Sequence, residues 1–219
     1  PSFLEFGVGY SIINGSIEIG KQIRLTSPGA THVSVKGGYF FNPYIGIGAE
    51  VTALTSPMAF DMSLYNGSSP SESYNIIRVH ADPTGVFTFT GGPYFSLPVA
   101  GKLLLGTKFQ AGYSHFLGNE VEIDIQDKMP PNIIKKDIIF MKGESSNGLI
   151  MRTGISATGI INRNLGIRMY VDYDYTSLNA PYRILSNPGE EKPVYGDLHY
   201  SKHKMHYFTI GATVTALFW

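Results

Sequence analysis

The chain has no cysteine, so it forms neither a disulfide nor a thiolate metal site. Charged residues make up only 16% of it, below the roughly 25% of ordinary soluble domains. The 17 basic and 17 acidic residues balance, which leaves no basic field to bind nucleic acid. No run of about 18 apolar residues is present, so the sequence excludes a membrane-spanning helix.

Glycine and aromatic residues are abundant instead, with 25 Gly, 14 Tyr and 13 Phe in 219 residues. This composition is typical of strands that carry aromatic belts. The length fits a single domain over residues 1–219.

The last segment shows the dominant pattern of the chain. From Tyr207 to Phe218, large apolar residues alternate with threonine and glycine. Side chains of a strand point alternately to its two sides, so one face of this strand is apolar and the other polar. Phe218 continues the apolar set, whereas Trp219 is out of phase with it.

The same alternation recurs at about the length of a strand that spans a membrane. We predict eight strands. They cover Phe3–Ile12, His32–Phe41, Tyr44–Leu54, Gly85–Phe95, Leu103–His115, Leu149–Ile161, Leu165–Tyr175 and His206–Trp219.

Short and long connections also alternate along the chain. We expect tight turns at Asn42–Pro43, around Ser96–Gly101 and at Asn162–Asn164, and long polar loops elsewhere. The expected loops are Ile13–Thr31, Thr55–Thr84, Phe116–Gly148 and Ser177–Lys204. Outer-membrane barrels have short periplasmic turns and long external loops. The pattern therefore predicts an all-β, eight-stranded, antiparallel up-and-down transmembrane barrel, integral to a bacterial outer membrane, with both termini periplasmic.

The polar face is predicted to line the lumen, because it holds most strand glycines and charges of both signs. A narrow barrel needs small residues on its inner wall, and buried charges must pair. The expected lumen charge network is Glu5, Lys36, Glu50, Lys108, Arg152, Arg168 and Asp172. A salt-bridged plug is favoured over a pore, since eight strands leave room only for side chains.

Aromatic residues of the apolar face gather near the strand ends, as expected for girdles at two membrane–water interfaces. The predicted girdle residues are Tyr10, Tyr39, Phe41, Tyr44, Phe95, Tyr113, Tyr173, Tyr175, Phe208 and Phe218.

The segments GGYFFNPYIGIGAEV and LLLGTKFQAGYSH, together with the terminal TALFW, resemble the small OmpA/OmpX-type outer-membrane barrels. The resemblance is greatest to the β-barrel-domain proteins of Bacteroidota and covers essentially the whole chain. It is one of pattern rather than of a diagnostic motif, so it implies fold and location more than function.

Catalytic and metal sites are weakly indicated, and we predict no catalytic residue, cofactor or metal. Ser114 and His115 are adjacent, so they point to opposite faces and do not pair as nucleophile and base; Glu120 would be the acid of such a site. His199 and His203 would be about 13 Å apart on an extended chain, too far to share one metal ion. His206 belongs to the same histidine-rich segment.

The loop between the fifth and sixth strands contains two strand-like segments, VEIDIQ and IIKKDIIFMK. We predict a hairpin above the membrane that offers backbone edges and apolar side chains to a partner. Its candidate binding residues are Val121, Ile123, Ile125, Ile138, Phe140 and Met141.

Three functions are compatible with these patterns. The first is a structural or accessory subunit that binds a larger outer-membrane complex for transport, secretion or barrel assembly. The second is a stand-alone surface barrel that acts as an adhesin-like binder or a small pore. The third is a lipid-modifying enzyme. In each case the expected surroundings are outer-membrane lipid and lipopolysaccharide.

Overall fold

The computed structural model describes residues 2–14, 16–19, 23–26, 29–57, 59–60, 74–118, 120–127, 134–185 and 195–218. These residues contain no helix long and apolar enough to cross a membrane. The barrel strands are β1 (Ser2–Asn14), β4 (Ala30–Phe40), β5 (Ile45–Ser56), β8 (Thr84–Ala100), β9 (Leu103–Phe116), β12 (Ser146–Asn162), β13 (Leu165–Leu185) and β14 (Tyr195–Phe218).

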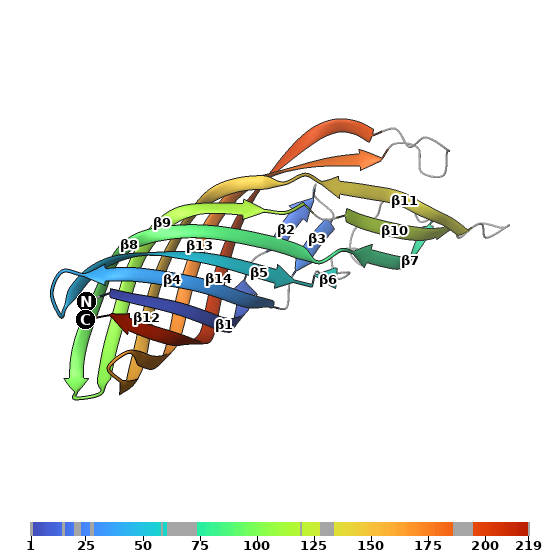
Figure 1. Ribbon diagram of the computed structural model, residues 1–219. Coiled ribbons are helices and arrows are strands. Elements are labelled where there is room, and N and C mark those ends of the chain that lie inside the picture. The colour runs from blue at the N-terminus through green and yellow to red at the C-terminus, as the bar shows by residue number, and fades with distance from the viewer. Residues whose placement is uncertain are drawn as a thin grey trace.

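These eight strands form one closed antiparallel barrel, as predicted. Each pairs with the next in chain order, and the β1–β14 pairing closes the ring from Ser2↔Phe218 to Asn14↔His206. Figure 1 shows the two termini side by side at one end of the barrel, where the short turns also lie.

The alternation sorts side chains to the two sides of the wall. Phe6 is 60% exposed and Val214 56%, whereas their neighbours Glu5 and Thr215 are fully buried in the lumen. Large apolar side chains cover the outside along all eight strands. Such a wall is stable only against hydrocarbon, because an apolar belt of this extent is not left in water.

Two of the predicted short turns are built by asparagine side chains. The Asn42 Oδ1 accepts the backbone N–H groups of Tyr44 (2.8 Å) and Ile45 (2.9 Å), and the Asn162 Oδ1 accepts that of Asn164 (2.9 Å). The prediction of a turn around Ser96–Gly101 is wrong. β8 continues to Ala100 and pairs with β9 through Ser96↔Gly106 and Leu97↔Leu105, so the chain reverses only at Gly101–Lys102.

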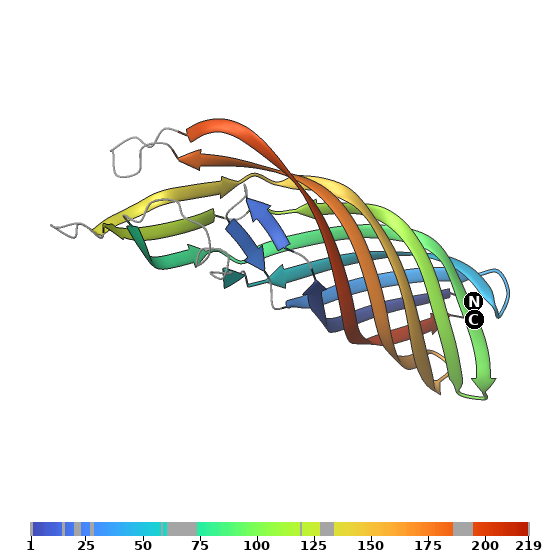
Figure 2. The ribbon, with the colours of Figure 1, turned by 180° about the vertical axis from the view of Figure 1, so that it is seen from behind.

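At the end of the barrel away from the termini, much of the chain predicted as long loops forms strands instead. The Ser177–Lys204 segment is mostly strand, because β13 and β14 stay paired from Ser177↔Lys204 to Leu185↔Tyr195. β7 (Tyr74–Ala81), β10 (Glu120–Asp127) and β11 (Ile134–Gly143) continue the sheet beside them in the order β13-β11-β10-β7. We call β7, β10, β11 and the outer parts of β13 and β14 the end sheet, and Figure 2 shows it projecting beyond the barrel. A second small sheet joins β2 (Ser16–Ile19), β3 (Ile23–Thr26) and β6 (Ala59–Phe60).

Candidate functional site

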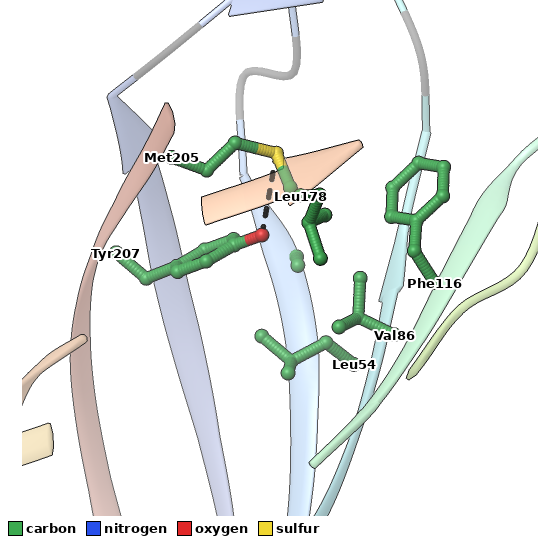
Figure 3. Packing of buried hydrophobic residues seen from close by; sticks show 7 residues of the cluster. Leu54, Val86, Phe116, Leu178, Met205 and Tyr207 are labelled. Atoms are coloured by element: carbon green, nitrogen blue, oxygen red, sulfur yellow. Dashed lines mark hydrogen bonds between the residues drawn. The ribbon is translucent and has the colours of Figure 1, made fainter. Parts of the chain in front are cut away.

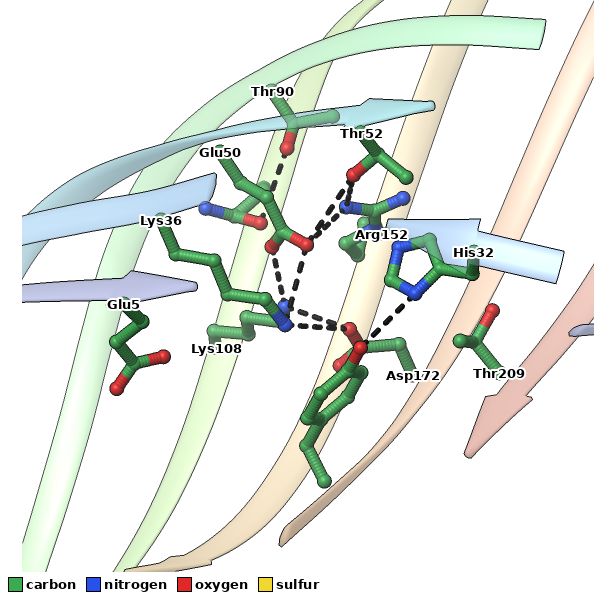
Figure 4. Close-up of polar contacts among 12 residues, drawn as sticks. Glu5, His32, Lys36, Glu50, Thr52, Thr90, Lys108, Arg152, Asp172 and Thr209 are labelled. Carbon is green, nitrogen blue, oxygen red and sulfur yellow. Dashed lines mark hydrogen bonds and ion pairs between the residues drawn. The ribbon is translucent and has the colours of Figure 1, made fainter. Parts of the chain in front are cut away.

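The middle of the lumen holds a network of ion pairs (Figure 4). The Lys108 ammonium, from β9, lies 2.7 Å from the Glu50 carboxylate of β5 and 2.8 Å from the Asp172 carboxylate of β13. Lys36, from β4, lies 3.3 Å and 3.6 Å from the same two carboxylates. The two lysines and two acids thus link four strands across the barrel.

Arg152 joins this network from β12. Its guanidinium lies 2.8 Å from the Glu50 carboxylate, donates to Thr52 at 3.0 Å, and pairs with Asp174. The central network therefore contains three cations (Lys36, Lys108, Arg152) and three anions (Glu50, Asp172, Asp174). Balanced and paired charges make this burial tolerable, since an unpaired buried ion costs several kcal/mol.

Glycines make room for these long side chains. The position of a Cβ on Gly154 is taken by the Asp172 carboxylate and by the Lys108 stem, and that of a Cβ on Gly211 by the Tyr170 ring. Tyr170 in turn supports the network, because the Lys36 ammonium lies 3.4 Å from its ring centre. Its hydroxyl is hydrogen-bonded to the His32 Nδ1 at 3.0 Å.

A second ion pair lies closer to the termini. The Arg168 guanidinium is 2.8 Å from the Glu5 carboxylate and donates to the Thr158 hydroxyl at 2.8 Å. The Thr215 hydroxyl donates to Glu5 at 3.0 Å. The seven charges predicted to face the lumen thus fall into two groups, one around Glu50 and one around Glu5.

Above the central network, at the end-sheet side, the lumen is lined by apolar side chains, which we call the upper apolar layer (Figure 3). Its described members come from β1, β4, β5, β8, β9, β13 and β14. Its buried members are Ala30, Leu54, Val86, Phe116, Leu178, Met205 and Tyr207, with half-buried Ile13 packed against them.

A lower apolar layer closes the lumen near the termini. Phe3, Tyr94 and Leu217 are buried there, with Phe40 and Ile160 packed against them. The Phe3 and Tyr94 rings meet edge to face, with centres 5.4 Å apart. The cavity between this layer and the central network measures about 20 Å³, enough for about one water molecule. The lumen is therefore filled with side chains at three levels.

The described residues form no catalytic constellation around Ser114 and His115. Ser114 is buried in the lumen, whereas His115 lies on the outer wall, with its Nδ1 2.6 Å from the Asn147 Oδ1. The side chain of Glu120 lies outside the described set. The predicted opposite orientation of Ser114 and His115 is thus what the structure shows.

The histidine-rich segment is extended rather than helical. His199 and His203 lie on β14, a continuous strand, so their Cα atoms are about 13 Å apart. His206 points to the outer wall and is hydrogen-bonded to the Tyr173 hydroxyl at 2.5 Å. Among the described residues, no group of three acidic or histidine side chains is placed to hold a metal ion.

Most predicted girdle residues lie on the outer wall. The Tyr39 and Phe41 rings pack edge to face near the termini, with their centres 5.6 Å apart. Tyr173 and Tyr175 are only half-exposed, because they pack against His206. The other predicted members are exposed there, namely Tyr10, Tyr44, Phe95, Tyr113, Phe208 and Phe218.

The predicted hairpin is present as β10 and β11, paired from Glu120↔Lys142 to Gln126↔Ile134. Its strands do not continue β9 and β12 without interruption, and β10 also pairs with β7, which the sequence placed in a loop. The side chains of Val121, Ile123, Ile125, Ile138, Phe140 and Met141 lie outside the described set, so their binding role stays a prediction.

Sequence reasoning missed several lumen residues that the same alternation places there. Asp174 follows Asp172 by two residues and was not included among the paired charges. Leu54, Phe116 and Leu178 likewise continue the inward phase of their strands. Phase was the available signal for Asp174 and Leu54, which lie within predicted strands, whereas Phe116 and Leu178 lie in segments that we predicted as loops.

Comparison with known proteins supports the fold. No family model matches the chain, and no curated protein matches it in sequence. The outer-membrane protein OprG of Pseudomonas aeruginosa is similar in structure, with a TM-score of 0.51 and 14% identity over 98% of this chain and 95% of that one. A major outer-membrane protein of Thermus thermophilus matches with a TM-score of 0.50 and 14% identity over 97% and 99% of the two chains.

A weaker likeness, to the attachment invasion locus protein Ail of Yersinia pestis, has a TM-score of 0.43 and 13% identity over 97% of both chains. The likenesses to OprG and to the Thermus protein, each at 14% identity, establish the fold of a small outer-membrane barrel and nothing finer. No family model or curated sequence links the chain to Bacteroidota, so that part of the resemblance stays a prediction.

Proposed function

We propose that this chain is a sealed outer-membrane barrel that works by itself as an adhesin-like protein. The end sheet lies on the external side and binds the partner. The observation that carries the proposal is that the lumen and the end sheet differ in their access to a ligand. The lumen is blocked at three levels, whereas β13 and β14 continue far past the wall into an additional sheet.

Strand lengths support an external role for the end sheet. A strand that spans a membrane needs about 9–11 residues. β13 has 21 residues and β14 has 24, so about half of each is not required for the span. This excess length extends the sheet beyond the membrane, where a soluble or surface-bound partner has access to it.

The end sheet is fixed to the barrel rather than merely tethered. β11 pairs with β13 from Met141↔Ile184 to Gly143↔Tyr182. Beside this contact, the Arg183 guanidinium lies 2.8 Å from the Glu144 carboxylate. Among the described residues β7 is the last strand of this sheet, and its outer edge offers backbone groups for strand addition by a partner.

The filled lumen argues against the pore alternative. Water and ions would have to pass two apolar layers and a paired network of six charges. Apolar constrictions block ions by excluding water. The accessory-subunit interpretation gains no support from the described residues, because the exposed side chains of the outer wall are mainly apolar and suited to lipid.

Two measurements test the proposal together. In gentle detergent the native protein should migrate alone, as a 24.0 kDa barrel with its detergent. Bacteria that display the barrel should adhere to a cultured cell monolayer, and replacing residues 120–143 by a short Gly-Ser linker should abolish this adhesion. A matched variant with two glycines inserted between Gly101 and Lys102, at the other end, should adhere normally. Co-migration with a stoichiometric larger protein, or adhesion that survives the replacement, would overturn the proposal.

A further inference from the structure

A groove runs across the outer wall over four consecutive strands, β8, β9, β12 and β13. Its volume is about 620 Å³, within the range of small-molecule binding sites. Three of its lining residues, Gly92, Gln110 and Arg152, belong to the inward set. The outward side chains along it are Pro93, Phe109, Ala111, Met151, Thr153, Tyr173 and Tyr175.

The groove exists because several outward positions here carry small side chains, whereas most outward positions of the wall carry large apolar ones. Gly91 and Ala111 are directly paired across β8 and β9, and Thr153 lies opposite Phe109 on the next pair. A Cβ on Gly91 would meet only the Gly48 carbonyl, at 3.5 Å, which is an ordinary contact. Packing therefore does not require glycine at 91, and the effect of glycine there is to leave the wall open.

Two polar residues of β14, outside the groove's lining, flank its Tyr175 end. Tyr175 lies opposite His206 on β14, and the His206 ring contacts both Tyr175 and Tyr173, with centres 5.2 Å and 5.9 Å apart. Lys204 is exposed on the same face of β14, two residues or about 7 Å further toward the end sheet. The lining of the groove thus includes the Tyr175 phenol, and the His206 imidazole and the Lys204 ammonium lie beside that end.

We propose that this groove binds one lipid A molecule, the acylated phosphosugar anchor of lipopolysaccharide. Its acyl chains would lie over Gly91, Ala111 and Thr153, and a phosphate would be held by Lys204 beside His206. The groove is continuous with the apolar belt, so hydrocarbon is what surrounds it, and the cation lies at the depth of a lipid headgroup. The choice of lipid A rests on the proposed function, which puts the end-sheet side, and therefore Lys204, in the outer leaflet.

The test uses the full-length purified barrel in detergent and counts retained lipids by native mass spectrometry. Purified lipid A and phosphatidylglycerol are titrated separately. Gly91→Leu fills the trough and should weaken retention of lipid A about tenfold, since it displaces roughly two methylenes of buried chain. Gly159→Leu is the matched control. Gly159 is also outward and uncrowded, because a Cβ placed on it would have only the Ile167 carbonyl near it, 3.9 Å away, and this variant should bind like the parent.

Lys204→Glu tests the headgroup contact. This variant should retain less lipid A than the parent, and it should retain as much dephosphorylated lipid A as the parent. The proposal is overturned if Gly91→Leu and Gly159→Leu bind equally, if phosphatidylglycerol is held as well as lipid A, or if the groove instead mediates a dimer of the chain. A gel shift on heating shows that each variant is folded. Detergent solution has no leaflets and no cells, so these results do not depend on the adhesion result.

Discussion

Arg152 on β12 and Asp174 on β13 face each other in register and are joined by two hydrogen bonds, Nε to Oδ1 at 2.6 Å and Nη2 to Oδ2 at 2.7 Å. The pair is buried in the lumen wall, and the Arg152 guanidinium also reaches Glu50. Two strands are thus held together by side chains as well as by their backbone ladder.

We expect Arg152→Met to destabilise the barrel by about 3–5 kcal/mol, because it leaves an uncompensated negative charge in the lumen. The double variant Arg152→Met with Asp174→Asn restores the balance at two cations and two anions, so it should recover most of the lost stability. Urea unfolding in detergent measures both. A double variant no more stable than the single one would show that charge balance is not what stabilises this layer.

Gly91 and Gly92 are neighbours on β8 that should respond oppositely to alanine. A methyl on Gly91 would make only an ordinary contact with the Gly48 carbonyl, at 3.5 Å. Gly91→Ala should therefore be neutral or stabilising by up to about 1 kcal/mol, because it restricts the unfolded chain. A methyl on Gly92 would overlap the Phe109 carbonyl of β9. Because backbone must then shift, Gly92→Ala should cost about 1–3 kcal/mol or prevent barrel closure. The fraction of each variant that stays folded on an unheated gel measures the difference between Gly91→Ala and Gly92→Ala. Equal folded fractions would contradict the assignment of Gly91 to the outer face and Gly92 to the inner one.

What could be predicted from the sequence depends on what each pattern encodes. Strand number, faces and the asparagine turns were predictable, because period-2 alternation and local hydrogen bonding are properties of adjacent residues. The pairing of Lys108 with both Glu50 and Asp172 was not, since it joins residues 58 and 64 positions apart in the chain. The upper apolar layer was missed for two reasons. Leu54 lies on the inward face of a predicted strand, a face that we took to be polar throughout, and Phe116 lies just beyond the predicted end of its strand, in a segment predicted as a loop. β7 was missed because its pairing with β10 depends on a distant strand rather than on its own sequence.

The sealed lumen predicts an electrically silent barrel. In a planar bilayer the protein should give no steady current, and Lys108→Met should also give none, because the upper apolar layer around Leu54 and Phe116 stays in place. This outcome differs from that of a pore, in which neutralising a wall lysine changes conductance. A stable current in the parent, altered by Lys108→Met, would establish the pore alternative.

The apolar outer wall predicts that a charged side chain on it lowers the free energy of unfolding by an amount that depends on its depth in the membrane. Val214 lies near the middle of the outward apolar set that runs from Phe208 to Phe218, and it is 56% exposed. Val214→Arg should therefore destabilise the barrel in lipid by about 2–4 kcal/mol, the usual cost for arginine on the lipid face at the bilayer midplane. Ser177→Arg, an exposed outward position opposite Lys204, should cost about 0–1 kcal/mol because it lies near headgroups. Reversible unfolding from vesicles of defined composition measures both values. Equal costs at the two positions would mean that the outer wall does not span a hydrocarbon layer, which would remove the physical basis for placing this barrel in a membrane.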